Sequence, residues 1–130
     1  MDVEISHGPP RVSLEDLVPP LLGYLEGTEV ERAIVFGAFA RGEADAASDL
    51  DLVLIERTTE PFLERGRRHL PLFRLGIGID LLVYTPQEYA RLRDDGHPLI
   101  ERIEREGRTV YARPGERGPE PRLCRTRPAR

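Results

Sequence analysis

The sequence contains no lysine, so all 19 basic side chains are arginines. This absence excludes chemistry that needs an ε-amine, such as lysine–AMP ligation, Schiff-base formation and the lysine of a P-loop. A cationic side chain that contacts a phosphate must therefore be an arginine. The single cysteine, Cys124, has no partner for an internal disulfide or a zinc site.

Long hydrophobic runs are also missing. No apolar stretch approaches the roughly 20 residues that a transmembrane helix needs. The N-terminus does not show the basic and then apolar segments of a secretory signal. We therefore expect a cytoplasmic protein without a membrane partner, and 130 residues leave room for one small domain.

Charge is unevenly distributed along the chain. The net charge is −4, but residues 112–130 hold six arginines and two glutamates, which leaves −8 on the rest. An acidic body argues against direct nucleic-acid binding and fits a site that collects a divalent cation. Proline, glycine and arginine dominate residues 113–130, which predicts a disordered tail. Residues 1–12 predict a flexible arm, so the domain should span residues 13–112.

Hydrophobic patterns predict strands that alternate with helices. The expected strands are Val30 to Phe36, Leu50 to Glu56, Gly76 to Tyr84 and Arg108 to Tyr111. The expected helices begin at Ser13, Glu60, Thr85 and Leu99, with a short helical turn at 38–43. This order predicts an α/β or α+β fold, with a small mixed sheet and helices on one face.

Two of the expected helices contain prolines. Pro19-Pro20 should break the first helix or restart it as a second one. The helix from Glu60 to Phe73 is weakened near its end by Pro71, and its large apolar residues should share one side. These residues are Phe62, Leu63, Leu70 and Phe73.

Acidic residues stand at the head of an otherwise apolar strand. Asp49 and Asp51 are two positions apart, so their side chains share one face with Cα atoms about 6.6 Å apart. Two unit charges about 4 Å apart repel by about 4 kcal/mol at an effective dielectric of about 20. Open solvent, a raised pKa or a divalent cation can each relieve this repulsion. If Asp80 on the third strand joins them, the oxygen-rich cluster suits Mg²⁺.

Four sequence blocks between about Val30 and Tyr111 carry a family resemblance. Phe-Gly-Ala-Phe-Ala-Arg-Gly at 36–42 is similar to Phe-Gly-Ser-Arg-Ala-Arg-Gly, and Ser-Asp-Leu-Asp-Leu at 48–52 is similar to Ser-Asp-Ile-Asp-Leu. The segments 80–88 and 103–111 match later blocks of the same family. The chain thus resembles the polymerase β-type nucleotidyltransferase superfamily, in particular its minimal nucleotidyltransferase branch.

The resemblance implies attack of a hydroxyl on the α-phosphate of ATP or another NTP, with release of pyrophosphate and two metal ions bound. It assigns catalytic and Mg²⁺-binding roles to three acids, of which the last helps deprotonate the hydroxyl. They are Asp49, Asp51 and Asp80. It assigns nucleotide contacts to four further residues, namely Gly37, Ala38, Arg41 and Ser48.

Some of these residues have a structural alternative. Asp49 and Asp51 could form a solvated strand end, and Asp80 could be paired with an arginine. Arg41 could be a surface residue, while Ser48 could brace its loop.

Two positions depart from the family pattern. Ala38 replaces a serine, which removes a hydrogen bond worth about 1.5–3 kcal/mol, or roughly ten- to a hundredfold in rate. Phe39 replaces an arginine and removes a possible second cation. Both changes leave the three acids intact, so catalysis remains the first hypothesis.

At this length we expect no second domain that binds an acceptor, so the acceptor surface should come from another protein or another copy of the chain. The branch often pairs with a HEPN-domain protein, where it acts as an antitoxin that adds AMP to a tyrosine of the partner. One alternative is nucleotidyl transfer to a small molecule such as an aminoglycoside. Another is an antitoxin that acts by binding alone.

Overall fold

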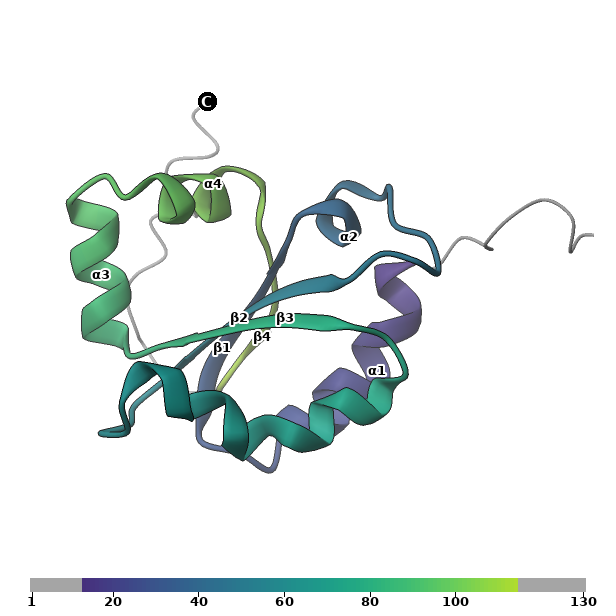
Figure 1. Cartoon of the computed structure of the whole chain (residues 1–130), viewed down its shortest axis with the longest axis horizontal. Coiled ribbons are helices and arrows are strands. Elements are labelled where there is room, and N and C mark those ends of the chain that lie inside the picture. Colours follow the sequence, from purple (N-terminus) through teal and green to yellow (C-terminus); the bar gives the residue numbers. More distant parts are fainter. Residues whose placement is uncertain (1–12, 115–130) are drawn as a thin grey trace, which may run out of the picture.

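A computed structural model of the chain describes residues 13–114. The predicted arm at 1–12 and the predicted tail lie outside this range, apart from residues 113 and 114. Helices and strands alternate around a single sheet (Figure 1). In chain order the elements are α1 (Leu14–Leu25), β1 (Val30–Phe36), α2 (Ala38–Arg41), β2 (Leu50–Glu56), η2 (Phe62–Leu75), β3 (Ile79–Tyr84), α3 (Pro86–Asp94), α4 (Pro98–Glu106) and β4 (Arg108–Ala112).

The sheet has four strands in the order β3-β2-β1-β4. Strand β1 runs antiparallel to both β2 and β4, whereas β2 and β3 are parallel. The predicted mixed sheet is therefore confirmed. β1 and β2 have the bounds expected from their apolar runs, while β3 begins three residues later than expected, after a glycine-containing turn.

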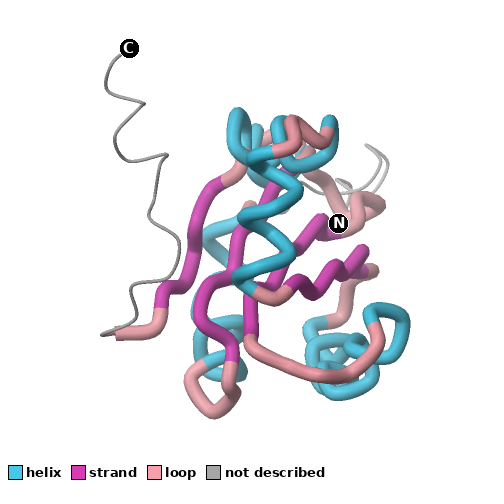
Figure 2. The backbone as a smooth tube through the Cα atoms, turned by 90° about the vertical axis from the view of Figure 1, so that its left-hand side faces the viewer, coloured by secondary structure: helices cyan, strands magenta, loops and turns pink. Residues whose placement is uncertain are grey.

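Helices cover both faces of the sheet, so the expectation of helices on one face is wrong. On one face, Leu52 and Leu54 of β2 pack with residues of α1 and with Leu72 of η2. On the other, Val53 of β2 packs with residues of α3 and α4, including Ile100. The ribbon and tube views show α3 and α4 on the side of the sheet away from α1 and η2 (Figure 1 and Figure 2). The reason lies in β2, whose apolar residues follow one another without alternation and must be buried on both sides.

Helix α1 is continuous through Pro19 and Pro20, which contradicts the predicted break. The carbonyls that lose a helical donor belong to Glu15 and Asp16. Both of these residues are exposed, so water can replace the missing donors. The leucines of α1 lie on one side at helical spacing and are buried against the sheet, which favours the continuous helix.

Element η2 is a 3-10 helix with a kink at His69, rather than the α-helix expected there. Its inward residues are Arg65, His69 and Leu72. The four large apolar residues expected to share one side are its exposed ones, with 41% to 91% of their surface accessible. Polar contacts from other elements hold the two basic residues inside, and the helix pattern alone does not show such contacts.

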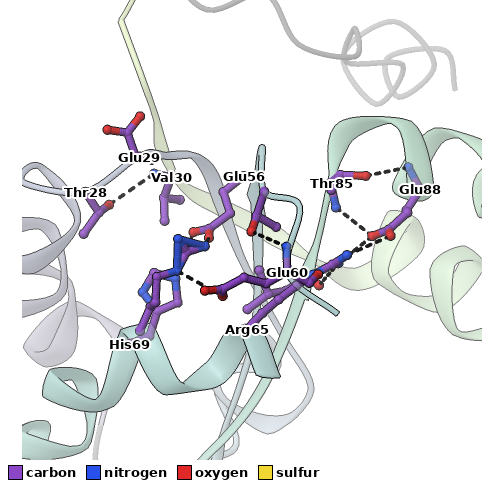
Figure 3. Close-up of polar contacts among 12 residues, drawn as sticks. Thr28, Glu29, Val30, Glu56, Glu60, Arg65, His69, Thr85 and Glu88 are labelled. Carbon is purple, nitrogen blue, oxygen red and sulfur yellow. Dashed lines mark hydrogen bonds and ion pairs between the residues drawn. The ribbon is translucent and has the colours of Figure 1, made fainter. Parts of the chain in front are cut away.

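A buried ionic cluster fastens η2 to the far end of β2 (Figure 3). Glu56 is only 1% exposed and lies 2.8 Å from Nε2 of His69, and it also pairs with Arg68. The hydroxyl of Tyr24 lies 2.6 Å from Nδ1 of the same histidine. Burial would raise the pKa of Glu56, but the interactions with His69 and Arg68 outweigh it and lower this pKa. This carboxylate is therefore compensated and serves the fold.

Close by, Arg65 fastens η2 to α3. Its guanidinium makes a two-pronged contact with Glu88, at 2.6 Å and 3.0 Å, and donates to the carbonyl oxygen of Val83 (Figure 3). The same glutamate accepts from the backbone amide of Thr85 and closes a capping box at the start of this helix. In the described part of the chain, no helix is long and apolar enough to cross a membrane.

Candidate active site

Asp51 and Asp80 lie side by side on neighbouring strands. They are register partners in the parallel pair of β2 and β3, whose backbones are about 4.8 Å apart. Leu50 and Leu52, the neighbours of Asp51 in β2, face α1 and η2. Because side chains alternate along a strand, Asp51 lies on the opposite side of the sheet, with α3 and α4. Asp51 is half-buried and Asp80 is exposed at an edge strand. The topology therefore brings together two acids that are far apart in the sequence.

The electrostatics of this pair are unfavourable. Burial raises the pKa of Asp51, and the charge of Asp80, a hydrogen bond with it and the charge of Asp49 raise it further. Only Arg102 opposes this shift. Within residues 13–114, none of the three acids forms an ion pair with an arginine or a histidine. A bound cation would relieve this repulsion, and carboxylate oxygens are the donors that Mg²⁺ prefers.

Two glycines leave room for the carboxylates. A Cβ atom on Gly37 would lie 2.2 Å from Oδ2 of Asp51, and one on Gly78 would lie 2.2 Å from Oδ1 of Asp49. Gly37 also has φ of 76°, a conformation that other residues rarely adopt. Gly37 is therefore favoured both by its backbone conformation and by the acid beside it, whereas a side chain at position 78 would have to displace the Asp49 carboxylate.

Asp49 is the outlying member of the trio. Its carboxylate lies over Gly78, while the carbonyl of this glycine accepts a 2.9 Å hydrogen bond from the next amide, that of Leu50. Among the described side chains, no three acids, histidines or cysteines are already grouped as a metal site. The donor chemistry fits a hard cation, and Asp51 with Asp80 forms its most closely assembled part.

The remaining predicted residues have structural partners. Ser48 accepts a hydrogen bond from the amide of Asp45 and donates to its carboxylate, so it braces its loop. Arg41 at the end of α2 pairs with Glu43 at 2.9 Å and with Glu106 of α4 at 3.2 Å. Its position next to the glycine turn is as expected, but its tie to α4 is not.

The short helix α2 follows the turn and is anchored by Phe39, which is 2% exposed in the leucine-rich core. Ala38 is half-buried beside it. Phe39 thus packs in the core at the position where the family that the sequence resembles has an arginine.

Two residues near the acids were missed by the sequence analysis. Arg102 of α4 lies over the ring of Phe36, 5.5 Å from its centroid, and Phe36 is the register partner of Asp51. Gly78 is the other. The four-residue spacing of Arg102 and Glu106 on a predicted helix was the available signal, but it indicates only a surface pair.

Comparison with known proteins now identifies the family. A profile described as a nucleotidyltransferase domain matches residues 22–114. This chain belongs to the nucleotidyltransferase domain family. The predicted fold and the prediction of a nucleotidyltransferase are thereby confirmed. A search of curated protein sequences finds no match.

Several solved structures share the fold of this nucleotidyltransferase domain. A toxin–antitoxin structure with AMP-PNP has a TM-score of 0.52 and 16% identity, covering 75% of this chain and 74% of that chain. The toxin–antitoxin MntA–HepT has a TM-score of 0.51 and 16% identity, with 76% and 73% covered. A tri-AMPylated Shewanella oneidensis HEPN toxin in complex with MNT antitoxin has a TM-score of 0.51 and 15% identity, covering 76% of this chain and 72% of that chain.

Proposed function

We propose that this nucleotidyltransferase is an antitoxin that transfers AMP from Mg²⁺-bound ATP to a tyrosine of a HEPN-domain partner. The observation that carries the proposal is the unpaired acid pair of Asp51 and Asp80 within a nucleotidyltransferase fold. The similar structures add support, because they include a toxin–antitoxin with AMP-PNP and a tri-AMPylated HEPN toxin.

The three acids would hold the metal, which neutralises phosphate charge and polarises the α-phosphate when bound. The tyrosine oxygen attacks the α-phosphorus, the bond to the bridging oxygen breaks and pyrophosphate leaves. Asp80 would take the hydroxyl proton. It is exposed on the edge strand β3, so an acceptor on another protein can reach it. The backbone of Gly37 and Ala38, with Arg41 nearby, would contact the phosphates.

The direct test incubates the chain with its HEPN partner, ATP and Mg²⁺, followed by intact-mass measurement of the partner. We expect a mass gain of one or more AMP groups, which disappears when Mg²⁺ is chelated or when the acceptor tyrosine is changed to phenylalanine. Asp49→Asn should abolish Mg²⁺-dependent ATP binding, and full retention would remove this residue from the site.

A second candidate function is an antitoxin that acts by binding alone. Phe39 is buried in the core and Ala38 has no hydroxyl, so neither side chain can donate to a phosphate. An unchanged partner mass with the toxin still inhibited would support this alternative. Under the first proposal, Ala38→Ser should raise the transfer rate by about ten- to a hundredfold if the missing hydrogen bond limits it.

Transfer to a small molecule is the remaining alternative, and it would appear as labelled AMP on an added hydroxyl compound. Nothing in the described residues favours it over a protein acceptor.

A further inference from the structure

One carboxylate holds two arginines at the rim of the acid site. Glu106 of α4 accepts from Arg102 through Oε2 at 2.7 Å and from Arg41 through Oε1 at 3.2 Å. The two arginines come from α4 and α2, and α2 directly follows the glycine turn. The two guanidinium groups are therefore held on neighbouring oxygens of the same side chain.

The guanidinium of Arg102 lies near the acids. It stacks on Phe36, which is opposite Asp51 in the β1–β2 register and directly precedes Gly37. Its charge is also close enough to lower the pKa of Asp51, against the effects of burial and of the neighbouring acids. The acid pair and the guanidinium thus lie on the same side of the sheet, next to the glycine turn.

The fold makes little use of this arginine. The side chain of Arg102 is 44% exposed, and a surface pair four residues apart on a helix contributes little to stability. Only its Nε donates within residues 13–114, so both terminal Nη groups are free to bind an anion. A planar guanidinium with free Nη groups matches two oxygens of a phosphate.

We propose that Arg102 contacts the β- or γ-phosphate of the bound nucleotide, and that Glu106 is the positioning residue that holds it beside Arg41. This inference rests on the proposed nucleotide site. It gives that site a cation from α4. In α2, the buried Phe39 stands where the family has an arginine, and Ala38 stands where it has a serine. The sequence has no lysine that could serve instead.

The test compares binding of ATP and of AMP to the full chain in Mg²⁺ by titration calorimetry. Arg102→Ala should weaken ATP binding by about ten- to a hundredfold, the range for a hydrogen bond to a charged group. AMP binding should hardly change, because AMP lacks the β- and γ-phosphates. Arg102→Lys should recover part of the loss. Arg105→Ala, an exposed position on the same helix, is the matched control and should bind ATP normally.

Four results would overturn the inference or a part of it. Unchanged ATP affinity in Arg102→Ala removes the contact, and an equal loss for ATP and AMP with a lowered melting temperature makes the residue structural. Failure of the unmodified chain to bind any nucleotide refutes the proposed function itself, and this inference with it. Glu106→Gln should weaken ATP binding less than Arg102→Ala and leave AMP binding unchanged. Equal or tighter ATP binding in this variant would refute the positioning role.

Discussion

Strand β2 carries a carboxylate near each end, and the two have opposite surroundings. Glu56 is buried on the side of η2, where His69 and Arg68 lower its pKa. Asp51 is half-buried on the other side, where burial and the neighbouring acids raise its pKa. Both residues lie on a strand that is otherwise buried and apolar. The same functional group thus stabilises the fold at one end and opposes it at the other.

The contrast teaches which acid to assign to function. A buried carboxylate with two cationic partners is fully explained by packing. A carboxylate beside other acids, with no ion pair among residues 13–114, is explained by what it can bind. Proteins accept such local destabilisation at sites where a ligand supplies the missing charge.

The largest loss of unfolding free energy should come from removing the charge of Glu56. Glu56→Gln keeps the shape but leaves the buried His69 without its carboxylate and Arg68 with Glu60 as its remaining anion, and loss of one partner of a buried pair costs about 3–5 kcal/mol. Urea denaturation should show this loss of unfolding free energy. Glu64→Gln is the control, because within residues 13–114 the Glu64 side chain pairs only with Arg67, at 3.7 Å on the surface, so the change should have little effect. A loss below 1 kcal/mol in Glu56→Gln, on the scale of an exposed pair, would contradict the assignment.

The next largest effect is expected at Gly37, the glycine beside Asp51 at the other end of β2. Gly37→Ala forces a side chain into a positive φ, which costs about 1–2 kcal/mol, and places its Cβ against Asp51. Gly42 is the matched control, since it has the same φ of 76° with nothing within 4 Å. We expect Gly42→Ala to lose stability but keep Mg²⁺-dependent ATP binding, and Gly37→Ala to lose both. Equal ATP binding by the two variants would separate Gly37 from the site.

A smaller effect of opposite sign is expected for Asp51→Asn. Removing one of the neighbouring negative charges should leave the protein as stable as before or more stable by about 0.5 kcal/mol, the scale of exposed charge pairs. The same variant should lose Mg²⁺-dependent ATP binding. A clear loss of stability would show that Asp51, like Glu56, serves the fold, and urea denaturation at neutral pH measures this.

The smallest effects should appear in how the stability differences of Glu56→Gln and Asp51→Asn from the unmodified protein depend on pH. The folded pKa of Glu56 is lowered, so its stabilising contribution is present above its ordinary value of 4.5 and is lost as the pH falls through the folded pKa. The deficit of Glu56→Gln should therefore shrink below about pH 4.5. The folded pKa of Asp51 is raised, so its penalty grows as the pH rises above 3.8. Any stability gain of Asp51→Asn should therefore be largest at neutral pH, and denaturation curves at several pH values measure both trends.

The sequence predicted the strands more accurately than the helices. Apolar runs within β1 and β2 marked both strands with their observed bounds, because strands of this kind are defined by burial. The continuous run in β2 also indicates burial on both faces, in agreement with the helices on both sides of the sheet. In η2, burial of Arg65 and His69 depends on Glu88 and Glu56, which lie in other elements. A pattern within one segment cannot show such partners.

For the site, the sequence motif indicated the three acids and the glycine turn, whose functional roles remain predictions. It did not indicate Gly78, Arg102 or the bracing of Ser48, since these depend on where separate segments meet. Arg41 and Glu106 are 65 positions apart and form their contact only in the folded chain.

The amino-acid sequence alone determined the family, the bounds of β1 and β2 and the spacing of Asp49 and Asp51, because each depends on residues close together in the chain. Only the tertiary structure decided that Asp80 stands beside Asp51 with no ion pair among residues 13–114, while Glu56 is paired with His69 and Arg68. It also decided that Arg102 lies over the partner of Asp51. The physical reason is that charge compensation acts through space, so strand order and helix packing decide which charged groups meet.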